Sequence, residues 1–172
     1  MPKPFFDLRG SHNPHRWHMP LTPPICVGPP EHLFMYGGIG LAASISALEQ
    51  TCGRPVVWAT AQYVSFARLD STVQLDVSVA QAGRSVTQAT VTGRIGDNVI
   101  FNVMAALGER DGYPDQHWRD MPDMPSPDVC EEQQQRPTQD PKSRLRQGLD
   151  VRLIPDPSRD EKAMLTRRSQ LW

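Results

Sequence analysis

An uncharged stretch in the first third of the chain predicts a long helix. From Ile39 to Leu48 the only polar side chains are the hydroxyls of Ser44 and Ser46, and good helix formers dominate. No proline interrupts the stretch, and Gly53 follows it at a position suited to a helix-ending glycine. A helix without a charged face belongs in a protein interior, and this one is too short to span a bilayer. We therefore predict a helix that the rest of its domain wraps.

Four segments after this helix carry the pattern of β-strands: residues 55–66, 72–80, 84–95 and 99–107. Residues 72–80 alternate most regularly, because Leu75 and three valines occupy one face whereas Gln74, Asp76 and Ser78 occupy the other. Glycine-containing turns near residues 83 and 96 separate the last three segments, which predicts an antiparallel meander. The apolar face of the meander needs a cover, and the uncharged helix supplies one. The predicted fold is therefore α+β, with a long central helix wrapped by a curved antiparallel sheet.

The distribution of the 17 prolines divides the chain. Between residues 31 and 113 only Pro55 occurs, whereas the others lie in the first 30 residues and after residue 113. Because proline removes a backbone donor and restricts φ, regular structure is expected only in the middle. We predict a proline- and histidine-rich arm (1–30), one folded domain (31–112) and a disordered linker (113–147). Residues 149–154 alternate like a strand, so we predict that residues 148–172 are the start of an incomplete second domain.

Charge and composition narrow the classes of function. The 172 residues carry a formal net charge of −1, which favours binding to neither nucleic acid nor an anionic membrane. The three cysteines are far apart and no secretory signal is visible, so a cytoplasmic location is expected. His12, His15 and His18 invite a metal site, but nearby prolines break the helix that would align them. We predict no metal site and expect instead that the arm packs Trp17 onto the domain.

Four short motifs occur in a fixed order along the chain. They are the helix opening Phe34-Met35-Tyr36-Gly37-Gly38, the strand 58–66, the turn Gly83-Arg84-Ser85 and the strand 99–108. Together they resemble the first half of the TesB-like acyl-CoA thioesterases, which are double-hotdog proteins with two helix-and-sheet repeats in one chain. The resemblance implies that residues 34–108 form the N-terminal hotdog, that the substrate is a fatty acyl-CoA and that no cofactor is required.

The resemblance does not supply a catalytic set. In the family the catalytic Asp, Thr or Ser, and Gln belong to the second hotdog, so none of these roles carries over onto this sequence. A His-Ser-Leu-His-type segment of typical members is replaced here by Ala59-Thr60-Ala61-Gln62. Any catalytic assignment must therefore come from the chemistry of the residues present.

Thioester hydrolysis needs a polarised carbonyl and a positioned water. Gly38 is the candidate for the first, because backbone N–H groups at a helix start favour developing negative charge and glycine leaves room for a substrate. Thr60 and Gln62, two apart on one strand face, are the candidates for positioning water. The substrate-binding candidates are Gly37, Gly40, Tyr36 and Arg84, the last for a CoA phosphate. Plainer interpretations stay open: glycines that permit close packing, and polar residues that are simply solvated.

Two functions are open from the sequence. The leading hypothesis is an acyl-CoA thioesterase of fatty acid metabolism whose activity depends on a second hotdog. The alternative is a catalytically inactive hotdog that binds acyl-CoA or serves as an assembly module. The alternative is favoured by the absence of Asp, Glu and His from the first three turns of the predicted helix, since Glu49 comes at its far end. Because an unpaired sheet edge is a liability, we expect a homodimer or pairing with a second hotdog domain.

Overall fold

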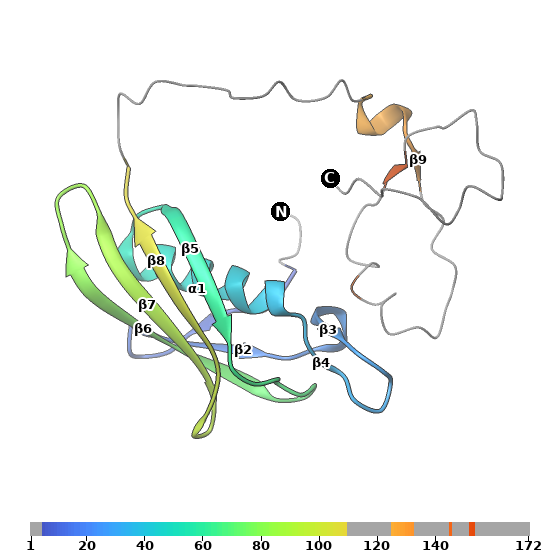
Figure 1. The fold of residues 1–172 in the computed structure, drawn as a ribbon, viewed down its shortest axis with the longest axis horizontal. Helices are drawn as coiled ribbons and strands as arrows, with labels where there is room; N and C mark the ends of the chain where they lie inside the picture. Colours follow the sequence, from blue (N-terminus) through green and yellow to red (C-terminus); the bar gives the residue numbers. More distant parts are fainter. Residues whose placement is uncertain (1–4, 110–124, 133–144, 146–151, 154–172) are drawn as a thin grey trace.

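The computed structural model describes residues 5–109, 125–132, 145 and 152–153. Its central element is helix α1 (Gly37–Cys52), which lies against one face of a six-stranded sheet (Figure 1). The strand order is β1-β2-β6-β7-β8-β5, and every pairing is antiparallel. The strands are β1 (Arg9–Gly10), β2 (Arg16–Pro20), β5 (Val56–Tyr63), β6 (Thr72–Ala82), β7 (Thr87–Ile95) and β8 (Asn98–Leu107). The predicted α+β arrangement of one long helix and a curved antiparallel sheet is confirmed.

The predicted meander is also present. Strand β6 pairs with β7, and β7 pairs with β8 through a tight turn in which Gly96 has a φ of 57°. The first predicted strand, β5, does not join the meander at β6. It pairs with β8 instead and so forms an edge of the sheet.

Helix α1 ends where the sequence predicts. Gly53 adopts the left-handed conformation (φ 63°), and its N–H donates to the carbonyl of Glu49 at 2.8 Å. Within the helix, the buried hydroxyl of Ser44 donates to the carbonyl of Gly40 at 2.8 Å, so its burial leaves no unsatisfied polar group.

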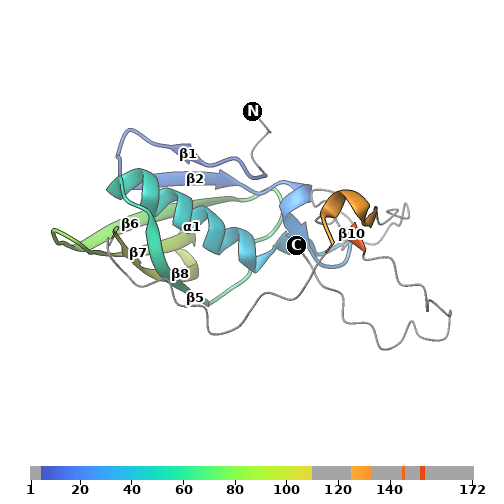
Figure 2. The same ribbon diagram turned by 90° about the horizontal axis from the view of Figure 1, so that it is seen from above.

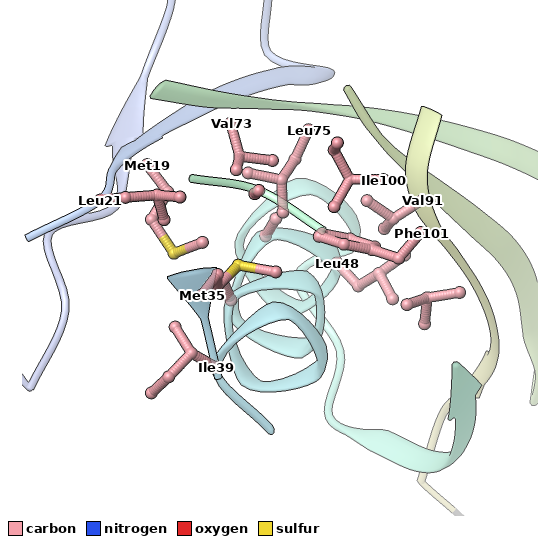
Figure 3. Packing of buried hydrophobic residues seen from close by; sticks show 14 of the residues in the cluster. Met19, Leu21, Met35, Ile39, Leu48, Val73, Leu75, Val91, Ile100 and Phe101 are labelled. Carbon is pink, nitrogen blue, oxygen red and sulfur yellow. The ribbon is translucent and has the colours of Figure 1, made fainter. Parts of the chain in front are cut away.

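The hydrophobic core fills the space between α1 and the inner face of the sheet (Figure 3). Leu48 of the helix is fully buried among side chains of β6, β7 and β8, with Phe101 beside it. Burying one such side chain is worth about 1.5–3 kcal/mol, so this packing is a major stabilising term. The largest fully buried side chains are Phe101, Met19, Ile25, Leu48, Leu75 and Leu107.

The sheet buries one side of α1 more completely than the other. The buried helical residues are Ile39, Gly40, Ala43, Ser44, Ala47 and Leu48. Leu41 and Ile45 on the other side are only partly buried, and Gly38 is exposed. In Figure 2 the helix runs between β1 and β2 on one side and β5 and β8 on the other, so the sheet curves around it without enclosing it. An uncharged helix surface thus has incomplete cover within the described residues.

Residues 5–30 contain more regular structure than their prolines predict. Strand β2 pairs with β6 over five residues, and β3 (Cys26–Val27), which follows the 3-10 helix η1 (Pro23–Ile25), pairs with β4 (Phe34–Met35). The expectation that regular structure is confined to the middle of the chain is therefore wrong. It failed because Pro20 is the last residue of β2, where a missing backbone donor costs little.

The expected packing of Trp17 is confirmed. Its ring packs against the core cluster, and its Nε1 donates to the hydroxyl of Thr51 near the end of α1 at 3.0 Å. This contact ties β2 to the helix as well as to the sheet.

The predicted linker and second-domain start lie mostly outside the described residues. The described parts contain the 3-10 helix η2 (Pro127–Val129) and an antiparallel pair of strands, β9 (Glu131–Glu132) and β10 (Arg152–Leu153). Strand β10 falls inside the strand predicted at 149–154, whereas the domain boundaries stay predictions. In the described ranges, no helix has the length and apolar character needed to cross a membrane.

Candidate functional site

Two tyrosines surround the start of α1. The hydroxyl of Tyr63, the last residue of β5, donates a hydrogen bond to the carbonyl of Gly37. A Cβ added to Gly37 would lie 3.2 Å from Cζ of Tyr63, and one added to Gly38 would lie 2.7 Å from a ring carbon of Tyr36. Both rings therefore lie directly against the backbone of the two glycines. This contact supports the close-packing interpretation of the glycines without excluding a role in binding.

The backbone donors at this helix start are only partly used. The N–H of Ile39 donates to the carbonyl of Tyr36, and that of Tyr36 donates to the carbonyl of Ile25, both at 3.0 Å. Among the described residues, no acceptor bonds the N–H of Gly37 or Gly38, no side chain caps the helix and no acidic residue lies in its first turn. Two free donors at the positive end of a helix dipole suit a carbonyl oxygen that gains negative charge.

Exposed aromatic rings extend from the helix start and form a surface that we term the aromatic cluster, defined by Phe34, Tyr36, Tyr63 and Phe66. The rings of Phe34 and Phe66 lie 6.3 Å apart, and the guanidinium of Arg68 lies 5.8 Å from the ring of Phe66. Burial, with a smaller contribution from Tyr36, raises the pKa of Tyr63, so its hydroxyl stays protonated at neutral pH. Grouped exposed aromatic side chains are typical of surfaces that bind a ligand or a partner.

Thr60 and Gln62 share one strand face, as expected, but it is the face away from α1. Their neighbours Ala59 and Ala61 pack against the core, so the alternate residues point outward. Both side chains are exposed on β5. The structure therefore does not bring Thr60 and Gln62 together with Gly38. Period-two alternation shows which residues share a face, but it does not show which face meets the helix.

Arg84 lies near the opposite end of α1. Arg54, which follows the helix-ending Gly53, donates to the carbonyls of Gly83 and Arg84 at 2.8 and 3.1 Å. The ends of a 16-residue helix are about 24 Å apart. Only a ligand as long as CoA could therefore contact both Arg84 and Gly38. Gly40 lies on the inner side of α1, where its backbone packs against Phe101.

Tyr63 is the site residue that sequence reasoning missed. Its hydrogen bond joins residues 26 positions apart, and no local pattern indicates which helix position the end of β5 will reach. Alternation with Ala59 and Ala61, after the irregularity between Val56 and Trp58, places its ring on the inner face, but only the folded sheet shows that its hydroxyl meets Gly37. Of the predicted candidates, the structure groups Tyr36, Gly37 and Gly38 around Tyr63.

Comparisons with known proteins agree with this architecture. Residues 28–108 match the family described as the acyl-CoA thioesterase N-terminal domain. A candidate thioesterase from Novosphingobium aromaticivorans is 35% identical with a TM-score of 0.76, and the match covers 87% of this chain and 59% of that one. A conserved protein with a hot dog fold from Alicyclobacillus acidocaldarius is 23% identical (TM-score 0.69; 90% and 55% covered). The tesB protein of Mycobacterium avium subsp. paratuberculosis is 22% identical (TM-score 0.59; 71% and 46% covered). No curated protein sequence matches.

The helix against a curved antiparallel sheet, together with these structural similarities, defines a hotdog-fold domain. Residues 28–108 belong to the TesB-like acyl-CoA thioesterase N-terminal domain family. The chain spans only 46–59% of the length of the three solved structures.

Proposed function

We propose that this chain is the N-terminal hotdog of an acyl-CoA thioesterase and contributes to the hydrolysis of fatty acyl-CoA thioesters. The observation that carries the proposal is the pair of free N–H groups at Gly37 and Gly38 in a domain of the acyl-CoA thioesterase family. In hydrolysis, water adds to the thioester carbon, the carbonyl oxygen becomes negatively charged, and the C–S bond then breaks to give a carboxylic acid and the CoA thiol. The two N–H groups would hold that oxygen, and removal of one such donor typically lowers kcat about 10²–10³-fold.

The aromatic cluster would bind the substrate next to these donors. Tyr36 and Tyr63 expose apolar ring surface on either side of the glycines, which suits an acyl chain or the pantetheine arm. Arg84, at the far end of α1, would meet a CoA phosphate only if the ligand ran along the helix. The water-positioning roles of Thr60 and Gln62 stay predictions.

We also propose that edge strand β5 pairs with a second hotdog, from another copy of the chain or from a longer protein. Val57, Trp58 and Met104 on and beside this edge are 71%, 53% and 58% exposed. An edge strand with free backbone groups and large exposed apolar side chains is a ready surface for strand pairing. A second hotdog there would also extend the cover over the outer side of α1.

A catalytically inactive acyl-CoA-binding or assembly module is the second candidate. It is favoured by the absence of an acidic residue in the first turn of α1. Glu49, the acidic residue of this helix, accepts a hydrogen bond from the N–H of Val56 at 2.9 Å and is committed to the helix-to-strand connection. A catalytic base would then have to come from a second hotdog or be absent.

The deciding experiment measures free thiol released from a panel of acyl-CoAs of increasing chain length. The chain is assayed alone and with the C-terminal remainder of the Novosphingobium relative supplied as a separate protein. Turnover that falls at least tenfold in Gly38→Ala supports the thioesterase, because the added methyl group obstructs the helix start. Binding of a non-hydrolysable thioether analogue without turnover supports the acyl-CoA-binding module. If the chain shows no binding and no turnover in either arrangement, both the thioesterase and the acyl-CoA-binding module are overturned, and the assembly module is left. Gln62→Ala in the same assay tests the water-positioning role directly.

A further inference from the structure

We propose that Tyr63 is a positioning residue: its hydroxyl holds the Gly37 carbonyl and thereby aims the Gly38 N–H at the substrate oxygen. This inference rests on the proposed function and deepens it. Tyr63 itself does not contact the reacting carbonyl in this account. It acts through the backbone of the helix start.

One peptide group links the two glycines at the start of α1. The carbonyl of Gly37 and the N–H of Gly38 belong to the same planar trans unit and point in opposite directions. A hydrogen bond that fixes the carbonyl therefore fixes the direction of the N–H. Two consecutive glycines would otherwise give this unit unusual freedom.

The hydrogen bond also strengthens the donor. A carbonyl that accepts a hydrogen bond polarises its own amide, so that the N–H on the other side of the unit becomes a better donor. Gly37 is the first residue of α1 and its carbonyl faces along the helix, so Tyr63 adds to the polarisation that the helix already provides. The N–H of Gly38 is the group that benefits, and no acceptor in the described ranges uses it.

Tyr63 is itself held in place. Its ring packs edge-on against Phe101, which is fully buried, with ring centroids 6.3 Å apart. The backbone of Tyr63 pairs with Phe101 at the end of β5. The hydroxyl is thus presented from a rigid sheet, whereas Gly37 and Gly38 have no side chains of their own to define their orientation.

The test compares Tyr63→Phe, which removes only the hydroxyl, with Tyr63→Leu, which also removes the ring. Ser78→Ala, on the outer face of β6, is the matched loss of a hydroxyl elsewhere. The variants are assayed under the condition in which the wild type hydrolyses acyl-CoA, either alone or with the C-terminal remainder supplied. There Tyr63→Phe should lower kcat about tenfold and change KM less than about twofold, because misaligned groups slow the chemical step. The Gly38 amide resonance of the full chain should shift in Tyr63→Phe and stay in place in Ser78→Ala.

Two results would overturn the inference. A Tyr63→Phe protein with wild-type kcat and an impaired Tyr63→Leu protein would show that the ring, and not the hydroxyl, matters. An unmoved Gly38 amide in Tyr63→Phe would show that the hydrogen bond does not set that peptide. Both leave the proposed function standing, whereas a wild type that hydrolyses no acyl-CoA in either arrangement overturns the proposed function and this role together.

Discussion

The sheet and α1 differ in how well the polarity of their residues matches their burial. On β6, Val73 and Leu75 point inward and are buried, whereas Gln74 and Asp76 point outward to water. On α1 both sides are uncharged between Ile39 and Leu48, yet one side is buried and the other is only partly covered. The sheet is matched to its environment within this chain, and the helix is not.

This contrast indicates where the domain is incomplete. Exposed apolar surface costs free energy, and a folded domain seldom leaves it uncovered without a partner or ligand. The outer side of α1, the β5 edge and the aromatic cluster are the surfaces of the described domain that lack matching cover. Inner and outer surfaces of the domain should therefore differ in energy as they do in burial, and substitutions at matched positions on the two surfaces measure that difference.

The largest expected effect comes from a charge placed on the two sides of α1. Leu48→Asp buries a carboxylate without a partner, and we expect a loss of more than about 4 kcal/mol, enough to unfold the domain. Ile45→Asp on the outer side should cost far less, because that position is only partly buried. Thermal melts followed by circular dichroism measure both, and equal loss of structure in the two variants would contradict the one-sided packing.

The next largest effect is expected at the edge of the sheet. If β5 pairs with a second hotdog, Trp58→Asp should weaken self-association by about 2 kcal/mol or more, as aromatic residues at interfaces often do. Ser78→Asp, also exposed but on β6 inside the sheet, is the control. Light scattering over a concentration series checks this, and a wild-type chain that stays monomeric at high concentration counts against self-pairing.

Alanine substitutions of Gly38 and Gly40, which lie on opposite sides of α1, should differ by a smaller amount in their effect on stability. A Cβ at Gly40 would lie 3.0–3.2 Å from Met35 and the fully buried Phe101, so Gly40→Ala should destabilise by about 1 kcal/mol despite its better helix propensity. At Gly38 the three atoms nearest the added methyl all belong to the exposed ring of Tyr36, which can turn away. Gly38→Ala should therefore leave stability unchanged or raise it by up to about 1 kcal/mol. Urea unfolding curves compare the two, and a Gly38→Ala loss as large as that of Gly40→Ala would break the contrast.

Local patterns predicted most of the fold. Uncharged residues predicted the helix, Gly53 predicted its end, and alternation with turns predicted the meander. Each of these signals depends on neighbours in the sequence, and all three predictions are confirmed. The edge position of β5 and the inclusion of β2 in the sheet depend on pairing between distant segments, which no local pattern specifies. The site was reached only in part for the same reason. Gly37 and Gly38 could be chosen from helix physics, whereas Tyr63 could not.

The smallest expected effect concerns the outer face of the sheet, where the polar residues are already matched to water. Asp76 accepts hydrogen bonds from Nε of Arg16 at 2.8 Å and from Gln74 at 3.0 Å. Partial burial raises the pKa of Asp76, but these hydrogen bonds and the charges of Arg16 and Arg94 outweigh it and hold the pKa below its usual value. Because the folded-state pKa is lowered, the stabilisation is complete above the unfolded pKa of about 4 and is lost as the pH falls through the folded value.

Asp76→Asn should therefore reduce the free energy of unfolding by no more than about 1 kcal/mol at pH 7, since the ion pair is partly exposed. The difference from wild type should shrink below about pH 4, where the carboxyl becomes protonated in the wild type too. Asp7→Asn is the control, because Asp7 pairs with Arg9 only two residues away on the exposed surface and should leave the unfolding midpoint unchanged. Denaturant midpoints between pH 3 and 7 measure this, and a gap that widens toward low pH would show that the outer face is stabilised by something other than this ion pair.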